Sequence, residues 1–176
     1  MSLCTLRLGA LASGVLAAAL TTGTASAQRG GSITQPGAHL HYALEVEPHM
    51  AFGFAHYRGY GAGVGPGVRV TFPLSHEGLV PEINNSVGIG LGLDLLFHDS
   101  SNTMQLPVVM QWNFHFHKRF SAFFEPGLGF GYTFSDGRAR LFPAVAIGMR
   151  VHFSDKQALV LRLGYPAAAL GLSFFF

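Results

Sequence analysis

The sequence predicts an all-β fold, namely an eight-stranded antiparallel up-and-down transmembrane β-barrel, and three observations support this prediction. Eight segments alternate apolar and polar residues with a period of two, and each ends in turn residues, as short strands in a barrel do. Charged residues make up 11 % of the chain, against roughly 25 % in typical soluble domains. Apolar residues reach 49 %, and no segment has the spacing of an amphipathic helix.

The first 27 residues predict a secretory signal peptide that is removed on export. Arg7 precedes an apolar run over residues 8–20, and Ala25-Ser26-Ala27 supplies a small-residue cleavage pattern. Removing these 27 residues from the chain of 176 leaves 149, the size of one small domain. Cys4, the only cysteine, would leave with the leader, so we expect no thiol or disulfide in the mature chain. Residues 28–37, QRGGSITQPG, are polar and glycine-rich and predict a short disordered lead-in.

Residues 38–176 predict the barrel, because a turn-rich stretch follows each alternating segment. The eight predicted strands are residues 38–55, 61–74, 86–97, 103–117, 120–134, 140–153, 158–165 and 168–176. In chain order, the stretches between them are about AHYRGYG, LSHEGLVPEINN, HDSSN, HKR, FSDGRA, SDKQ and GYPA. An even number of strands returns the chain to its starting side, so the second, fourth and sixth stretches share one end of the barrel with both termini.

One side-chain parity is apolar throughout every predicted strand, because successive side chains of a strand point to opposite faces. In strand order, this apolar face carries Leu40, Tyr42, Leu44, Val46, Met50, Phe52 and Phe54; Val64, Val68, Val70 and Phe72; Val87, Ile89, Leu91, Leu93 and Leu95; Met104, Leu106, Val108, Met110, Trp112, Phe114 and Phe116; Phe120, Phe124, Leu128, Phe130, Tyr132 and Phe134; Leu141, Val145, Ile147, Met149, Val151 and Phe153; Leu159, Leu161, Leu163 and Tyr165; and Leu170, Leu172, Phe174 and Phe176. None of these residues is charged.

The opposite, polar face is predicted to line the inside of the barrel. It carries three ladders of alternate glycines, at residues 63–67, 88–92 and 127–131, which cover a surface poorly but suit a crowded interior. The apolar face is too large to fit inside eight strands, and its aromatic residues concentrate near the strand ends, as in the two aromatic girdles of a membrane barrel. We therefore expect the apolar face to contact lipid.

Charged residues on the polar face predict a charge-paired lumen. The acids are Glu45, Glu47, Asp94 and Glu125, and the bases are Arg69, Arg150 and Arg162. Since an unpaired charge is costly in a confined interior, we expect salt bridges that fill and rigidify the barrel. The alternative is a gated or leaky pore, which the small bore of eight-stranded barrels disfavours.

Five histidines are predicted to lie on the lumen face at the end of the barrel that holds the termini. His39 and His41 begin the first predicted strand, His115 and His117 end the fourth, and His152 ends the sixth. Neutral imidazoles that converge there could bind a transition metal or form a pH-sensitive plug. Ordinary polar filling is favoured, because the first and fourth strands lie far apart around the wall. Neither a metal nor a cofactor is therefore predicted.

The last predicted strand carries a family resemblance. YPAAALGLSFFF has apolar residues at alternate places up to Phe176, and it resembles the C-terminal signal of Gram-negative outer-membrane barrels that the assembly machinery reads. With its signal peptide and eight strands, the whole mature chain resembles the small OmpA-, OmpX- and OmpW-like barrels. The resemblance implies a place in the outer membrane, surrounded by lipopolysaccharide and phospholipid. We also expect a monomer.

Function is less constrained, because this architecture has adhesion, structural, enzymatic and transport roles, and the predicted outer loops are unusually short. We predict a non-enzymatic outer-membrane protein with a structural or interaction role in the cell envelope. One alternative is a narrow solute or ion channel, with a wet path past Arg69, Glu125 and Arg150. The mature chain has ten basic and nine acidic residues, so it offers no basic field for nucleic acid.

The second alternative is a lipid-modifying outer-membrane enzyme in which His98 meets a loop serine. HDSSN and the following Ser135-Asp136 contain the residue types of a hydrolase site. Neighbours in sequence rarely form a triad, and HDSSN is also a typical hydrophilic turn. The pattern of the resembling lipid deacylases, His and Ser two apart on one strand, is absent. No catalytic residue is therefore predicted.

Overall fold

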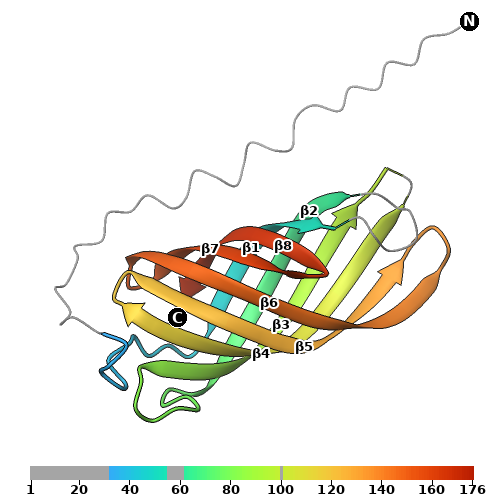
Figure 1. Cartoon of the computed structure of the whole chain (residues 1–176). Coiled ribbons are helices and arrows are strands. Elements are labelled where there is room, and N and C mark those ends of the chain that lie inside the picture. The colour runs from blue at the N-terminus through green and yellow to red at the C-terminus, as the bar shows by residue number, and fades with distance from the viewer. Residues whose placement is uncertain (1–31, 55–61, 100) are drawn as a thin grey trace, which may run out of the picture.

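The computed structural model describes residues 32–54, 62–99 and 101–176. The predicted signal peptide, residues 28–31 of the predicted lead-in, residues 55–61 and Ser100 lie outside the described residues. Within these ranges eight strands form one closed antiparallel barrel, in which each strand pairs with its neighbours in sequence and the first pairs with the last (Figure 1). The strands are β1 Glu45–Gly53, β2 Gly63–Ser75, β3 Asn85–Phe97, β4 Asn102–His117, β5 Phe120–Thr133, β6 Arg138–Ser154, β7 Gln157–Tyr165 and β8 Ala167–Phe175. The predicted fold class is confirmed.

The two ends of the barrel carry different connections. At one end, which we call the terminal mouth, lie residues 32–44, the carboxyl terminus and the connections 76–84, 118–119 and 155–156 (Figure 1). The opposite end, the distal mouth, carries residues 98–99 and 101, the connection 134–137 and the single residue Pro166 between β7 and β8. In the described part of the chain, no helix is long and apolar enough to cross a membrane.

Strand boundaries agree with the sequence to within two residues, except at the start of β1. The first strand begins at Glu45 instead of residue 38, because residues 38–44 leave the sheet and cross the terminal mouth. The N–H groups of Ala43 and Leu44 both donate to the carbonyl of Phe176, at 2.7 and 3.2 Å. These two bonds hold the crossing segment against the end of β8.

The late start of β1 corrects the placement of two apolar side chains. Leu40 and Tyr42 were expected on the lipid-facing side, but both line a cavity of about 70 Å³ in the terminal mouth. The Tyr42 ring packs edge-on against Phe175 of β8, with ring centroids 4.9 Å apart. Outside the strand the period-two alternation no longer holds, so parity cannot assign these residues to a face.

The described part of the lead-in also differs from its prediction, because residues 32–37 form tight turns. The Gln35 N–H donates to the Ser32 carbonyl at 3.0 Å, and Gly37 has a φ of +71°, a conformation that glycine adopts readily. Hydrogen bonds to β4 and to the β2–β3 turn hold this segment in place. Ser32 forms a bridge with His117, and the Asn84 N–H donates to the Ile33 carbonyl at 2.7 Å.

The outer wall is apolar on all eight strands, as the sequence predicts. Its most exposed strand members include Leu141, Leu128 and Ile147, at 77 %, 65 % and 60 %. One exception is Val87, which is buried. Asn85 lies two residues earlier on the same face of β3, and its side chain binds the β2–β3 turn there.

The inner glycines give room to larger side chains. A Cβ at Gly92 would lie 2.9 Å from Nε of Arg69, and one at Gly90 would lie 3.4 Å from its Cδ. A Cβ at Gly148 would overlap the ring of Phe123. The glycine positions therefore let a narrow barrel accept arginine and phenylalanine side chains on its inner face.

Candidate functional site

The centre of the lumen holds Arg162 of β7, which binds two carboxylates at once. Its Nη1 and Nη2 donate to the two carboxylate oxygens of Glu47 at 2.6 and 2.9 Å. Its Nε and Nη2 donate to the two oxygens of Glu125 at 2.8 and 3.2 Å. Glu125 also accepts from Nη1 of Arg69 at 3.2 Å and from Nε2 of Gln111 at 2.8 Å. Strands β1, β2, β4, β5 and β7 thus meet through one buried cluster.

Arg150 of β6 forms a second bidentate pair. Its Nε and Nη2 donate to the two oxygens of Glu45 at 2.9 and 3.0 Å, and its Nη1 donates to Oδ1 of Asn113 at 2.8 Å. The hydroxyl of Ser173 donates to the same carboxylate at 2.6 Å. These hydrogen bonds connect β1 and β8 with β4 and β6 through side chains inside the lumen.

His49 connects Asp94 to the central cluster, although the predicted network did not include it. Its Nε2 lies 2.7 Å from Oδ1 of Asp94, and its Nδ1 lies 3.2 Å from the carbonyl and 3.4 Å from Oε1 of Glu47. Both ring nitrogens face oxygen acceptors, an arrangement that suits the imidazolium, because only the protonated ring donates from both nitrogens. With His49 protonated, the four lumen carboxylates would be matched by four cations, namely the three lumen arginines and His49. The sequence signal was available, since His49 has the parity of Glu47.

Phe123 is a second member that the sequence did not single out. The guanidinium carbons of Arg150 and Arg162 lie 4.4 and 5.2 Å from its ring centroid. Its parity, shared with Ser121 and Glu125, already places it inside. Both guanidinium groups thus lie within the distance at which a cation is attracted to an aromatic ring.

These side chains close the lumen over the described residues. Glu125 is 0 % exposed, Arg150 is 2 % exposed and Arg69 is 5 % exposed. One cavity, of about 70 Å³, lies at the terminal mouth, and another, of about 30 Å³, lies between Arg69, Glu125 and Pro166. Because Arg69, Glu125 and Arg150 are almost fully buried, the described side chains fill the lumen where these three residues lie.

The mouth histidines form two stacked pairs. The rings of His39 and His115 are parallel at 4.1 Å, and those of His41 and His76 are parallel at 4.2 Å. His39 and His41 are 5.2 Å apart, so the four rings make one group. The sequence missed His76 because it lies in the β2–β3 turn, where no parity applies.

His117 and His152, the other two predicted mouth histidines, lie outside this group. His117 is exposed, and its Nδ1 accepts from the Arg119 N–H at 3.3 Å. His152 lies 3.3 Å from the hydroxyl of Ser121 and stacks on Phe175 at 5.3 Å. The structure therefore brings together three of the five predicted histidines.

The loop that raised the enzyme alternative lies at the distal mouth. Nε2 of His98 is 3.2 Å from Oγ1 of Thr103. The hydroxyl of Ser101 donates to Oγ of Ser135 at 2.8 Å. The two described loop serines are therefore hydrogen-bonded to each other, and His98 is next to Thr103. Ser100 lies outside the described residues.

Comparisons with known proteins agree on the fold. No protein-family model matches the chain, and no curated protein matches it in sequence. Among solved structures, a designed transmembrane β-barrel is similar with a TM-score of 0.53 and 13 % identity, covering 78 % of this chain and 99 % of the design. Ail, the attachment invasion locus protein of Yersinia pestis, is similar with a TM-score of 0.51 and 12 % identity, covering 78 % of this chain and all of that one (100 %).

Proposed function

We propose that this chain is a non-enzymatic outer-membrane protein with a closed, charge-paired lumen and a structural or interaction role in the cell envelope. One observation carries the proposal: apolar side chains cover the outside of the barrel while the ion pairs are buried inside it. In water such a molecule would expose its apolar wall, whereas in a bilayer every backbone group is paired by the closed sheet and the wall meets lipid. The fold shared with Ail and with a designed transmembrane barrel supports the same setting.

The surroundings and partners in this proposal are lipopolysaccharide and phospholipid around the wall and the assembly machinery during insertion. Phe176, the last residue of the proposed C-terminal signal, is 70 % exposed, so its side chain is not buried in the barrel interior. Among the described strands, the pairing of β1 with β8 closes the sheet, so these strands offer no free edge for a second copy, which supports a monomer.

Closure of the lumen favours this role over a channel. A conducting path would have to pass the buried Arg69, Glu125 and Arg150, and each of them is held by a partner on another strand. Opening would require breaking several charge-assisted hydrogen bonds at once. The described distal connections are also short, which leaves little surface there for an adhesive site.

The test combines location with conductance. The chain would be expressed with its leader, recovered from separated inner and outer membranes, and examined by intact mass, heat-modifiable gel migration and planar-bilayer recording. We expect an outer-membrane protein that begins at Gln28, migrates faster when unheated and conducts no steady current. Recovery in the soluble fraction would contradict the location, and steady single-channel conductance would contradict the closed lumen.

A further inference from the structure

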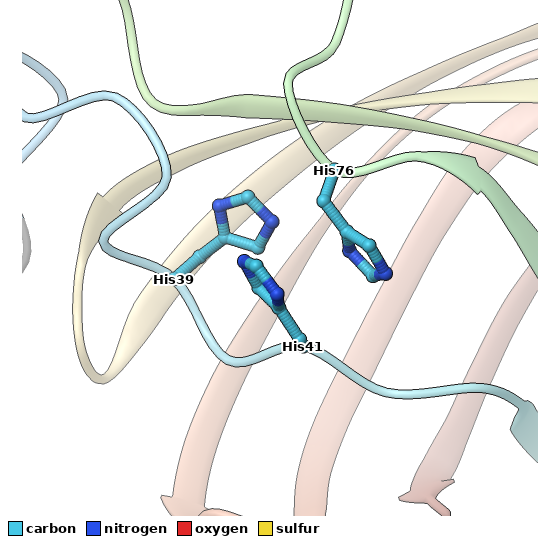
Figure 2. Close-up of side chains that lie close together, drawn as sticks. All are labelled: His39, His41 and His76. Atoms are coloured by element: carbon cyan, nitrogen blue, oxygen red, sulfur yellow. The ribbon is translucent and has the colours of Figure 1, made fainter.

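Three histidines at the terminal mouth lie within reach of one another. His39 and His41 come from the segment that crosses the mouth, and His76 comes from the β2–β3 turn (Figure 2). One ring nitrogen of each lies within 4.8 Å of those of the other two. His76 follows His41 by 35 positions, and the two meet because β1 begins, and its antiparallel partner β2 ends, at the same mouth.

Two ring nitrogens of this cluster, one on His39 and one on His76, have no hydrogen-bond partner among the described residues. Nδ1 of His39 donates to Oδ1 of Asn84 at 2.6 Å, which leaves the lone pair on Nε2. Nε2 of His39 and Nδ1 of His76 are buried and have no hydrogen-bond partner among the described residues. An unpaired buried nitrogen is costly, and an ion bound there would satisfy both.

Burial disfavours the protonated form of two of the three rings, those of His39 and His76. Burial lowers the pKa of His39 below its ordinary value, and the nearby His41 and His76 lower it further, against the opposing hydrogen bond from Asn84. Burial and the neighbouring His41 also lower the pKa of His76. Neutral imidazole is the form that binds a metal, and the closeness of the three rings is what makes a shared ion possible.

A supporting layer orients the first ligand. Asn84 is 1 % exposed, and its Nδ2 donates to the His115 carbonyl at 3.5 Å, which sets the amide so that its oxygen faces His39. The His39 ring is also stacked on His115. A metal-bound histidine commonly donates its other ring N–H to an oxygen acceptor of this kind.

One ligand must turn before all three can bind. A metal lies near the plane of each imidazole it binds, whereas His41 and His76 are stacked face to face, with planes 8° apart. His41 is exposed, so its side chain can rotate without disturbing packing. Rotation would bring its nitrogen from stacking distance toward the spacing of about 3.3 Å between ligands of a tetrahedral zinc ion.

We propose that His39, His41 and His76 bind one divalent transition-metal ion, with Zn²⁺ as the best fit, at the terminal mouth. Imidazole suits zinc, copper and nickel, and three histidines plus a water complete a tetrahedral zinc site. The bound ion ties residues 38–41 to the β2–β3 turn and thereby fastens the segment that covers the lumen.

Zinc titration of the purified protein tests the site. Untagged protein would be extracted in detergent, stripped with EDTA and titrated at pH 7.5 against a chromophoric chelator. We expect one Zn²⁺ per chain, and about tenfold or greater loss of affinity in both His41→Ala and His76→Ala. His117→Ala is the matched control, because it removes an exposed histidine of the same mouth outside the cluster, and it should bind as the unmodified chain does.

A second readout follows the tether itself. Zn²⁺ should slow amide hydrogen exchange over residues 38–44 in the unmodified chain and in His117→Ala, but not in His41→Ala. Heat-modifiable migration checks that each variant is folded; if His76→Ala does not fold, the exposed His41→Ala carries the test. Absence of zinc binding by the unmodified chain would overturn the proposal, as would equal binding by His41→Ala or an equal loss in His117→Ala.

Discussion

Replacing Glu125 with alanine removes the acceptor that three lumen side chains share. Arg162 keeps both of its bonds to Glu47, and Gln111 is neutral, so the largest penalty falls on Arg69. Nη1 of Arg69 donates to Glu125, and its Nε is buried with no partner among the described residues. Removing one member of a buried ion pair costs about 3–5 kcal/mol, so we expect Glu125→Ala to lower the free energy of unfolding by that amount.

The assay is equilibrium unfolding of the barrel in lipid vesicles, followed by the fluorescence of Trp112, the single tryptophan of the chain. Glu82→Ala, in the exposed part of the β2–β3 turn, is the control and should change the unfolding free energy by less than about 0.5 kcal/mol. The double variant Glu125→Ala/Arg69→Met should be more stable than Glu125→Ala alone, because it no longer buries an orphaned cation. A loss below about 1 kcal/mol in Glu125→Ala, or a further loss in the double variant, would refute the reasoning.

Two further predictions concern the outer wall and the turn that carries His76. Leu128→Arg, at a 65 % exposed position in the middle of β5, should lower the free energy of unfolding in vesicles by about 2–4 kcal/mol. Leu79→Arg, in the turn, should lower it by at most about 1 kcal/mol. Equal effects would argue against a lipid-facing wall. Asn85→Ala removes an amide that holds the turn by bonds to three carbonyls and two N–H groups, at 2.6 to 3.4 Å. A glutamate-specific protease should then cut within residues 76–84 faster than in the unmodified chain, while the barrel itself stays folded. Unchanged cleavage would show that the side chain of Asn85 is not what holds the turn.

The sequence alone determined which side chains lie inside and which outside. Alternation in eight segments was sufficient, because a strand repeats every two residues wherever it pairs. The same rule placed Glu47, Glu125 and Arg162 together on the lumen face without any knowledge of their partners. It failed at Leu40 and Tyr42, because the chain has left the sheet there and hydrogen bonds to Phe176 direct its path.

Only the tertiary structure decided which lumen groups meet. Arg162 and Glu47 are 115 residues apart, and their pairing depends on closure of the sheet and on the stagger of its strands, neither of which alternation records. The same holds at the terminal mouth. His76 lies in a turn, where sequence period carries no information, and it joins His39 and His41 only because the crossing segment and the β2–β3 turn fold onto one end of the barrel.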